Sequence, residues 1–179
     1  VRSRGLGDVY KRQILEEVHK LLPEAEIAYL DKLYPDFQID VQKEQERLLR
    51  ADIIVLQYPL FWYTAPSLLH RWIEKTFTHG FSHGKTGDKL KGKQLVLSFT
   101  AGAPEEMYSP EGPQQHPIDD FLTPYKQMAQ LCQLQWSGYV FSGRLSYASR
   151  HDEKELARMK EKSIRHAQLF YSSLRFFRL

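Results

Sequence analysis

The sequence predicts an α/β fold in which a parallel sheet is covered by helices on both faces, a doubly wound arrangement. Short apolar runs alternate along the chain with longer segments of helical periodicity, as in repeated strand–helix units. The strand candidates are apolar almost throughout, which is typical of strands that are buried on both faces. The 179 residues are enough for one domain with a sizeable core.

The first half of the chain supplies three predicted helices and two predicted strands. Apolar residues at helical spacing predict a helix over Ile14–Leu22, which Pro23 ends. Ala25–Leu30 is predicted as a short strand. Asp40 is a plausible N-cap for a helix over Val41–Arg50. Strand 53–58 follows, and Pro66 then opens a helix from its first-turn position.

The second half continues the alternation. A glycine-rich segment, 78–93, is expected to form a mobile flap before the buried strand Gln94–Thr100. Pro117 begins a predicted helix, in which Pro124 marks either a kink or the true start. The last strand is predicted over Gln135–Phe141. The last helix follows "SRHD", 149–152, which resembles a capping box.

Composition and charge narrow the class of protein. The formal charge is only +3, and the basic residues are scattered rather than gathered in a stripe, so we expect no nucleic-acid partner. The single cysteine, Cys132, lies on an apolar helix face and is expected to be a buried filler. One cysteine and no apolar run of about 18 residues together predict a cytoplasmic protein.

Two loops that leave carboxyl ends of predicted strands carry unusual residues. Ligands of parallel α/β sheets bind at that edge. The stretch "QYPLFWYTAP", Gln57–Pro66, places Phe61, Trp62 and Tyr63 where polar turn residues are usual. Thr100–Ala103 offers small residues and approachable backbone amides. Flat faces beside backbone donors suit a planar heteroaromatic ring, whereas the simpler interpretation is that Phe61 and Trp62 fill space under the flap.

Three other motifs carry less weight. "HGKTG", 83–87, contains Gly-Lys-Thr but lacks the strand and helix of a phosphate-binding P-loop. His79 and His83 have no evident third ligand, so no metal site is predicted. No G-x-S-x-G motif is present, so hydrolase chemistry is disfavoured.

Two long segments resemble the flavodoxin-like NAD(P)H:quinone oxidoreductase family, in particular the bacterial ancillary subunits of glutathione-gated potassium-efflux systems. They are "LQYPLFWYTAPSLLHRWIEKTFTHGFSHG" and "GKQLVLSFTAGAPEEMYSPEG", with "DKLYPDFQID" as further support. The resemblance covers Ile14 to the final helix. Its most specific parts are Gln57-x-Pro59-x-x-Trp62-Tyr63 and Thr100-x-Gly102.

The resemblance implies a flavin enzyme that takes hydride from NADPH or NADH and then reduces a quinone in a ping-pong cycle. FMN is the expected cofactor, with FAD as the alternative. Residues implied to hold the ring are Pro59, Leu60, Phe61, Trp62, Tyr63, Thr100, Ala101, Gly102 and Ala103. Tyr108 matches a tyrosine that lies over the flavin, and His116 is the candidate for handling charge and protons, although its spacing departs from the family's. A homodimer is implied, as is a second role as regulatory subunit of a membrane antiporter, which would place the protein at the inner membrane through its partner.

The N-terminus departs from the family's pattern. Members begin with a central buried strand and a phosphate-binding loop, whereas residues 1–13 read "VRSRGLGDVYKRQ" and resemble neither. We therefore expect 1–13 to be a non-native leader and 14–179 to form a single flavodoxin-like domain that lacks its first strand. Two alternatives would fill the gap: 7–12 as a poor strand, or movement of the strand predicted at 25–30 towards the strand at 53–58. In either case, we expect flavin to bind weakly or not at all.

Overall fold

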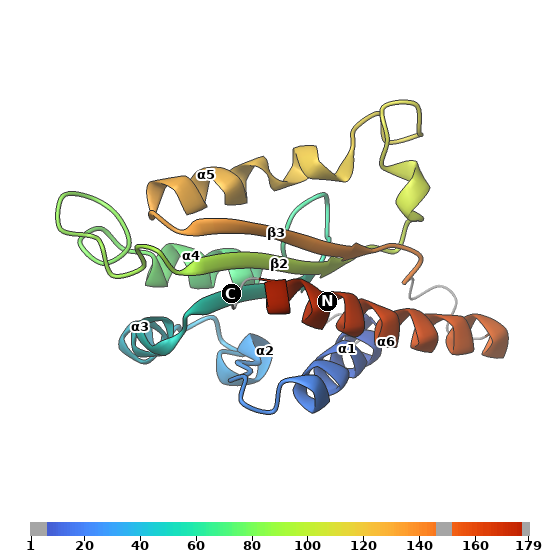
Figure 1. Ribbon diagram of the computed structural model, residues 1–179, viewed down its shortest axis with the longest axis horizontal. Helices are drawn as coiled ribbons and strands as arrows, with labels where there is room; N and C mark the ends of the chain where they lie inside the picture. Colours follow the sequence, from blue (N-terminus) through green and yellow to red (C-terminus); the bar gives the residue numbers. More distant parts are fainter. Residues whose placement is uncertain (1–6, 146–151, 177–179) are drawn as a thin grey trace.

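Three parallel strands form the centre of the structure, a computed structural model that describes residues 7–145 and 152–176. In chain order the elements are α1 (Gly7–Leu21), α2 (Leu30–Leu33), α3 (Val41–Arg50), β1 (Ile53–Pro59), α4 (Ser67–Thr76), β2 (Gln94–Thr100), the 3₁₀ turns η1 (Glu105–Met107) and η2 (Ile118–Leu122), α5 (Thr123–Leu131), β3 (Gln135–Ser142) and α6 (Glu153–Phe176). The sheet order is β1-β2-β3, with Pro59 beside Thr100 and Thr100 beside Ser142. Helices lie on both faces (Figure 1), so the doubly wound α/β class is confirmed.

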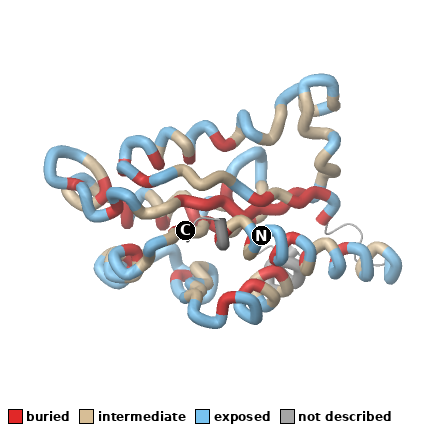
Figure 2. The backbone as a smooth tube through the Cα atoms, in the orientation of Figure 1, coloured by how far each residue is buried: buried red, intermediate tan, exposed pale blue. Residues whose placement is uncertain are grey.

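Two apolar clusters lie on opposite faces of the sheet. One joins α3, α4 and α5 to side chains such as Leu56 and Leu97. The other joins α1 and α6 to Val96 and Val140. β2 lies between its neighbours and is buried along almost its whole length (Figure 2), as the continuous apolar run "QLVLSFT" predicts. The carboxyl ends of the strands are thereby held at a single edge.

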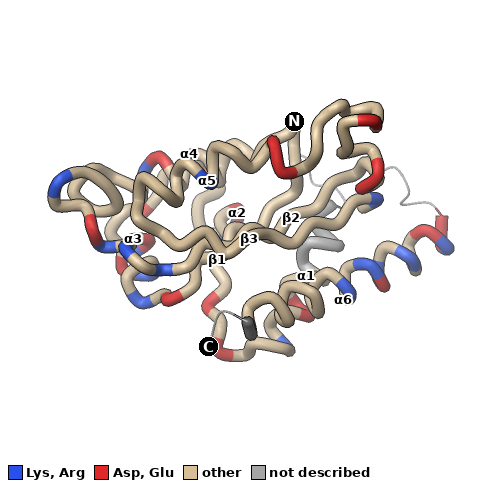
Figure 3. Tube along the Cα trace, turned by 45° about the horizontal axis from the view of Figure 1, so that its top comes forward, with Lys and Arg blue, Asp and Glu red and all other residues tan. Residues whose placement is uncertain are grey.

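Positive and negative residues are interspersed along the described parts of the chain. Lys and Arg alternate with Asp and Glu along the outer part of α6 (Figure 3). No helix in the described part of the chain is both long and apolar enough to span a bilayer. Within 7–145 and 152–176, no three His, Cys, Asp or Glu residues come together as a metal site would require.

Several element boundaries follow from their caps and prolines. Asp40 caps α3 by accepting a hydrogen bond from Lys43 N at 3.1 Å, as predicted. Pro124 marks the true start of α5, because the preceding turn of chain is a 3₁₀ helix. Asp152 Oδ1 accepts from Lys154 N at 2.9 Å at the start of α6, whereas the rest of the predicted capping box, 149–151, lies outside the described residues.

Two local predictions are wrong. The first helix begins at Gly7 instead of Ile14, so 7–12 is helical and does not form a replacement strand. The glycine-rich segment is folded into anchored turns, in which Ser82 and Leu90 are fully buried. Gly84 packs so closely on the His79 ring that an added Cβ would lie 2.4 Å from it. This close packing does not fit a loose flap.

The predicted strand Ala25–Leu30 is also wrong: 25–29 has no regular structure and α2 begins at Leu30. A strand needs a partner for its backbone groups. At the two ends of β1, Asp52 O accepts a hydrogen bond from Gln94 N, and Leu60 N donates one to Thr100 O. The backbone N–H and C=O groups of the even-numbered residues between them therefore point towards β2, and those of the odd-numbered residues point to the other side. Those odd-numbered groups have no backbone partner within the described ranges, and a cavity of about 2560 Å³ runs along this open edge. The sheet therefore lacks a neighbour between β1 and 25–29.

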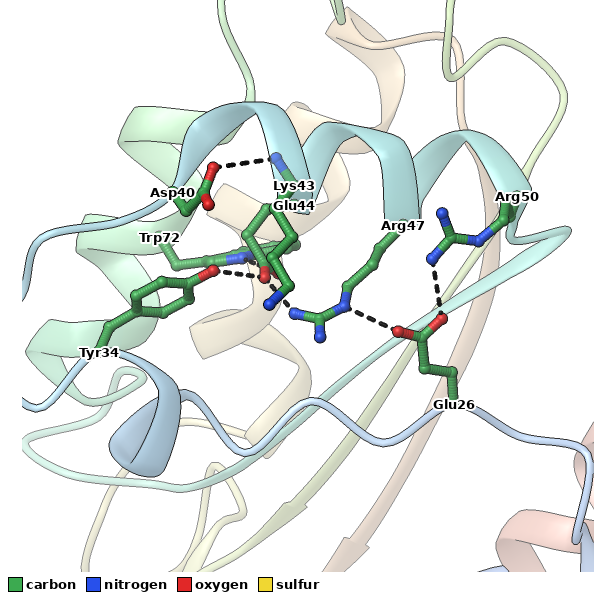
Figure 4. A network of polar contacts seen from close by, with 8 residues as sticks. All are labelled: Glu26, Tyr34, Asp40, Lys43, Glu44, Arg47, Arg50 and Trp72. Carbon is green, nitrogen blue, oxygen red and sulfur yellow. Dashed lines mark hydrogen bonds and ion pairs between the residues drawn. The ribbon is translucent and has the colours of Figure 1, made fainter.

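A buried carboxylate explains where 25–29 is held instead (Figure 4). Glu44 on α3 is only 1% exposed and accepts from Tyr34 Oη at 2.6 Å, from Trp72 Nε1 at 2.9 Å and from Arg47. Burial, followed by the hydrogen bond to Glu44, raises the pKa of Tyr34 to about 12. Arg47 also donates to Glu26 at 2.7 Å and thereby lowers the pKa of that carboxyl. The segment is thus bound to α3 through side chains and does not join the sheet.

Candidate functional site

The carboxyl ends of β1 and β2 meet where the sequence places its two unusual loops. Leu60 N donates to Thr100 O at 2.7 Å, which fixes the start of one loop against the start of the other. The cavity along the open edge of β1 reaches this point and is lined there by Pro59, Leu60, Phe61 and Thr100–Gly102. The structure therefore brings the two predicted groups of residues to one place.

The first loop contains a tight turn over Phe61–Thr64, which we call the aromatic turn. Phe61 N donates to Thr64 O at 2.8 Å, and Thr64 N donates to Phe61 O at 3.0 Å. The central residues Trp62 and Tyr63 have φ values of +48° and +65°, as in a type I′ turn. Glycine and asparagine are usual at such positions, and a bulky side chain there costs about 1–2 kcal/mol. Strain of this kind at a ligand edge points to a functional role.

The side chains of the aromatic turn are exposed to very different degrees. Trp62 is 92% exposed, whereas Phe61 and Tyr63 are about half exposed. Tyr63 is held by two contacts: its hydroxyl donates to Gln114 Oε1 at 2.9 Å, and its ring stacks on Phe121 with centroids 5.1 Å apart. The interpretation that Phe61 and Trp62 fill space under the glycine-rich segment is wrong, because both are exposed.

An aromatic cluster forms around Phe121. It comprises Tyr63, Tyr108, His116, Phe121 and Phe141. Tyr108 meets Phe121 and Phe141 edge-on, with centroids 6.2 and 5.4 Å away, and His116 lies 6.1 Å from Phe121. Partial burial raises the pKa of Tyr108, and the nearby Tyr63 adds to this effect. His116 is exposed, and its Nδ1 lies 3.0 Å from Asp120 Oδ2. Both residues predicted for chemistry thus lie beside the aromatic turn.

The sequence did not single out Phe121, Phe141 and Gln114. The sequence predicts one helix beginning at Pro117, and that helix would include Phe121. Phe121 lies instead in η2, where the tighter 3₁₀ turn directs the half-buried ring towards Tyr63 and Tyr108. The two prolines at 117 and 124 were the signal that two short elements replace one helix.

The second loop, Thr100–Ala103, is here called the β2 loop and is bound along one side to the chain after β3. Ala101 N donates to Ser142 O at 3.0 Å, and Ala101 O accepts from Leu145 N at 3.0 Å. Ala103 O accepts from Arg144 N at 3.0 Å. The amides of Gly102 and Ala103 have no acceptor among the described residues. Two adjacent donors are therefore available at the ligand edge.

A partly buried ion pair secures the far end of the β2 loop. Glu105 accepts from Lys162 Nζ at 2.8 Å and from Gly143 N at 2.7 Å. Burial would raise the pKa of the Glu105 carboxyl, but these hydrogen bonds outweigh it, so the pKa lies below the ordinary value. An added Cβ at Gly143 would lie 2.5 Å from Ala103 O, so only glycine allows this close approach.

Comparison with known proteins agrees with this geometry. Residues 4–167 match the family described as having a flavodoxin-like fold. The chain is 42% identical over 126 residues to the glutathione-regulated potassium-efflux system ancillary protein KefF of Enterobacter sp. (strain 638), covering 70% of this chain and 69% of that protein. It is 32% identical over 166 residues to the uncharacterized NAD(P)H oxidoreductase YdeQ of Bacillus subtilis (strain 168), covering 93% and 80%. The crystal structure of general stress protein 14 from Treponema denticola, in complex with FMN, superposes with a TM-score of 0.77 at 22% identity, covering 93% and 94% of the two chains.

Proposed function

The chain belongs to the flavodoxin-like NAD(P)H:quinone oxidoreductase family, and on that premise we propose that it transfers two electrons from a nicotinamide to a quinone through a bound flavin, FMN in preference to FAD. The observation that carries the proposal is the meeting of a strained aromatic turn with two free backbone amides at the carboxyl edge of a parallel sheet. FMN is preferred because a structure of the same fold holds it.

The described residues suit the ring of a flavin better than its phosphate. The unpaired amides of Gly102 and Ala103 match the polar edge of the ring, and Pro59, Leu60 and Phe61 supply apolar surface beside them. The proposal therefore concerns the ring, for which the described residues offer both hydrogen-bond donors and apolar surface.

Each group of residues has a distinct task in this proposal. The aromatic turn, including Trp62 and Tyr63, packs along the ring and excludes water from one side. The β2 loop, Thr100–Ala103, donates hydrogen bonds to the ring's polar edge. Tyr108 covers the opposite face, and His116, oriented by its contact with Asp120, carries a proton for the acceptor. A flavin bound here would supply the two-electron chemistry between NADPH or NADH and the quinone.

The test separates binding from turnover. We would titrate the chain with FMN and with lumiflavin, which has the ring but no phosphate, and follow flavin fluorescence. Lumiflavin is expected to bind, because the described residues offer partners to the ring itself. Turnover is then measured with NADPH and a soluble quinone at saturating flavin. Failure to bind lumiflavin at millimolar concentration, or bound flavin that NADPH and NADH both fail to reduce, would contradict the proposal.

A second function is favoured by the 42% identity to an ancillary protein of a potassium-efflux system. We propose that the chain also docks, as a homodimer, on the cytosolic part of such an antiporter, which would make it a cytoplasmic protein held at the inner membrane. The exposed aromatic turn offers apolar surface at which a second copy would border the site. Co-purification with the antiporter domain tests the docking. Failure to associate with or without nucleotide would remove it, and sedimentation as a monomer at all concentrations would remove the dimer.

A further inference from the structure

A fully buried histidine links three elements directly behind the β2 loop. His166 on α6 is 1% exposed. Its Nε2 lies 2.9 Å from Ser98 Oγ on β2, and its Nδ1 lies 2.8 Å from Ser142 Oγ at the end of β3. Both ring nitrogens are therefore used in hydrogen bonds, one to β2, from which the β2 loop continues, and one to β3, to which that loop is bound.

The chemistry of the imidazole ring requires the two serine hydroxyls to take opposite hydrogen-bonding roles. A neutral imidazole has one N–H donor and one acceptor nitrogen, so one serine hydroxyl must accept while the other donates. Burial lowers the pKa of His166 to about 4, and the ring is therefore neutral near pH 7. A hydroxyl can take either role, which lets both hydrogen bonds form without a buried charge.

The link continues into the β2 loop through the backbone of Ser142. Ser142 O accepts from Ala101 N at 3.0 Å, and Leu145 N returns a hydrogen bond to Ala101 O at 3.0 Å. The free amides of the site belong to the next two residues in the chain. One helical turn before His166, Lys162 binds Glu105 and also donates to Gly143 O at 3.0 Å. The same face of α6 thus holds both ends of the loop.

We propose that His166 is a positioning residue that sets the amides of the β2 loop through Ser142 and Ala101. The inference rests on the proposed function, because the amides matter only if they bind the flavin ring. His166 lies outside the site, but it would determine how well the amides of the β2 loop are placed to donate hydrogen bonds to the polar edge of the flavin ring. A residue that only filled the core would affect unfolding without changing the loop in the folded chain.

The experiment compares His166→Leu, His166→Gln and Ser142→Ala with a matched control, Ser163→Ala. Ser163 is also fully buried on α6, but among the described residues its hydroxyl bonds only to Met159 O, within the same helix. Native-state hydrogen exchange is measured at the amides of Ala101 and Leu145. Exchange at Val96, in the middle of β2, reports global opening. Lumiflavin affinity is measured under conditions where circular dichroism shows each variant folded.

We expect His166→Leu and Ser142→Ala to speed exchange at Ala101 and Leu145 by about tenfold or more relative to Val96, since a lost buried hydrogen bond has effects of that order. Lumiflavin should bind about tenfold more weakly. His166→Gln keeps one donor and one acceptor and should recover most of both effects, and Ser163→Ala should show neither. If His166→Leu does not fold, Ser142→Ala decides alone.

Equal acceleration at Val96 and Ala101 would overturn the inference, because it would show a purely structural role. Accelerated exchange at the β2 loop with unchanged lumiflavin affinity would overturn it too. If the wild-type chain does not bind lumiflavin, the proposed function is refuted, because the site does not bind the flavin ring. The exchange rates still report whether His166 holds the β2 loop in place. The two failures are therefore distinguishable.

Discussion

Acid is expected to destabilise this chain through His166 in a pH range where most carboxylates are still ionised. In the folded chain burial lowers the pKa of His166 to about 4, from the ordinary value of 6.5. Above pH 6.5 the imidazole is neutral in both the folded and the unfolded chain. Between pH 6.5 and 4 the unfolded chain binds a proton that the folded chain does not, so stability falls as the pH falls. Below pH 4 both states are protonated and no further loss arises from this group.

The size of the loss follows from the two pKa values. Each unit of difference between the folded and unfolded pKa values corresponds to about 1.4 kcal/mol in the free energy of unfolding. From values of about 4 and 6.5, the free energy of unfolding should fall by about 2 kcal/mol at pH 5 and about 3 kcal/mol at pH 4, relative to pH 8. This is a large share of the stability of a typical domain, about 5–15 kcal/mol. Glu26 and Glu105 have lowered pKa values and lose their contributions at lower pH.

Urea unfolding followed by circular dichroism at pH 8, 7, 6 and 5 measures this loss. His166→Gln is expected to remove most of the decline between pH 7 and 5, because it keeps hydrogen-bonding groups but does not titrate. Ser163→Ala, buried on the same helix, should be uniformly less stable and keep the wild-type slope. Parallel slopes for the wild type and His166→Gln would refute the reasoning, since they would mean that the imidazole titrates alike in both states.

Three substitutions test the packing and the site. Gly143→Ala should destabilise the chain by about 1–3 kcal/mol and weaken lumiflavin binding, because its Cβ would lie 2.5 Å from Ala103 O; an unchanged melting temperature would contradict this. Trp62→Asn should raise the free energy of unfolding by up to about 1–2 kcal/mol, because asparagine tolerates the left-handed backbone and Trp62 is 92% exposed, and it should lower flavin affinity; equal affinity would rule out stacking. Glu44→Ala should cost about 3–5 kcal/mol by urea titration because it leaves buried donors unpaired, whereas the exposed Glu46→Ala on the same helix should cost little; similar costs for the two would argue against the network.

The three strands, and the meeting of the two loops at the carboxyl ends of β1 and β2, could be predicted from the sequence because their signals are local. Ile53–Pro59 and Gln94–Thr100 are apolar runs, and prolines or glycines follow both. The strand predicted at 25–30 could not be judged in this way. Its residues alternate between exposed and half-buried as a strand's would, yet strand formation depends on a partner elsewhere in the sheet. That residues 1–13 are a non-native leader stays a prediction, as does the boundary at Ile14.

The role of His166 was missed for a different reason. Apolar periodicity predicts the last helix from residues such as Met159, Ala167 and Phe170, and it takes no account of the polar residues between them. Spacing of three and four residues places Ser163 and His166 on the same face as Met159 and Phe170, and all four are buried. Helical periodicity alone therefore indicated a buried histidine. Its partners on β2 and β3 lie far away in the sequence and could come only from the fold.

The aromatic turn is hard to explain by stability alone. Two residues with side chains in the left-handed region cost about 1–2 kcal/mol each relative to a relaxed backbone. Tyr63 offsets its share through Gln114 and Phe121. Trp62 has no hydrogen bond or ring contact within the described residues and remains 92% exposed. A side chain that strains the backbone and gains nothing within the monomer makes sense where it binds something outside it. The flavin ring and a second copy of the chain are the two candidates that the Trp62→Asn variant can distinguish, since the first changes lumiflavin affinity and the second changes the sedimentation of the chain.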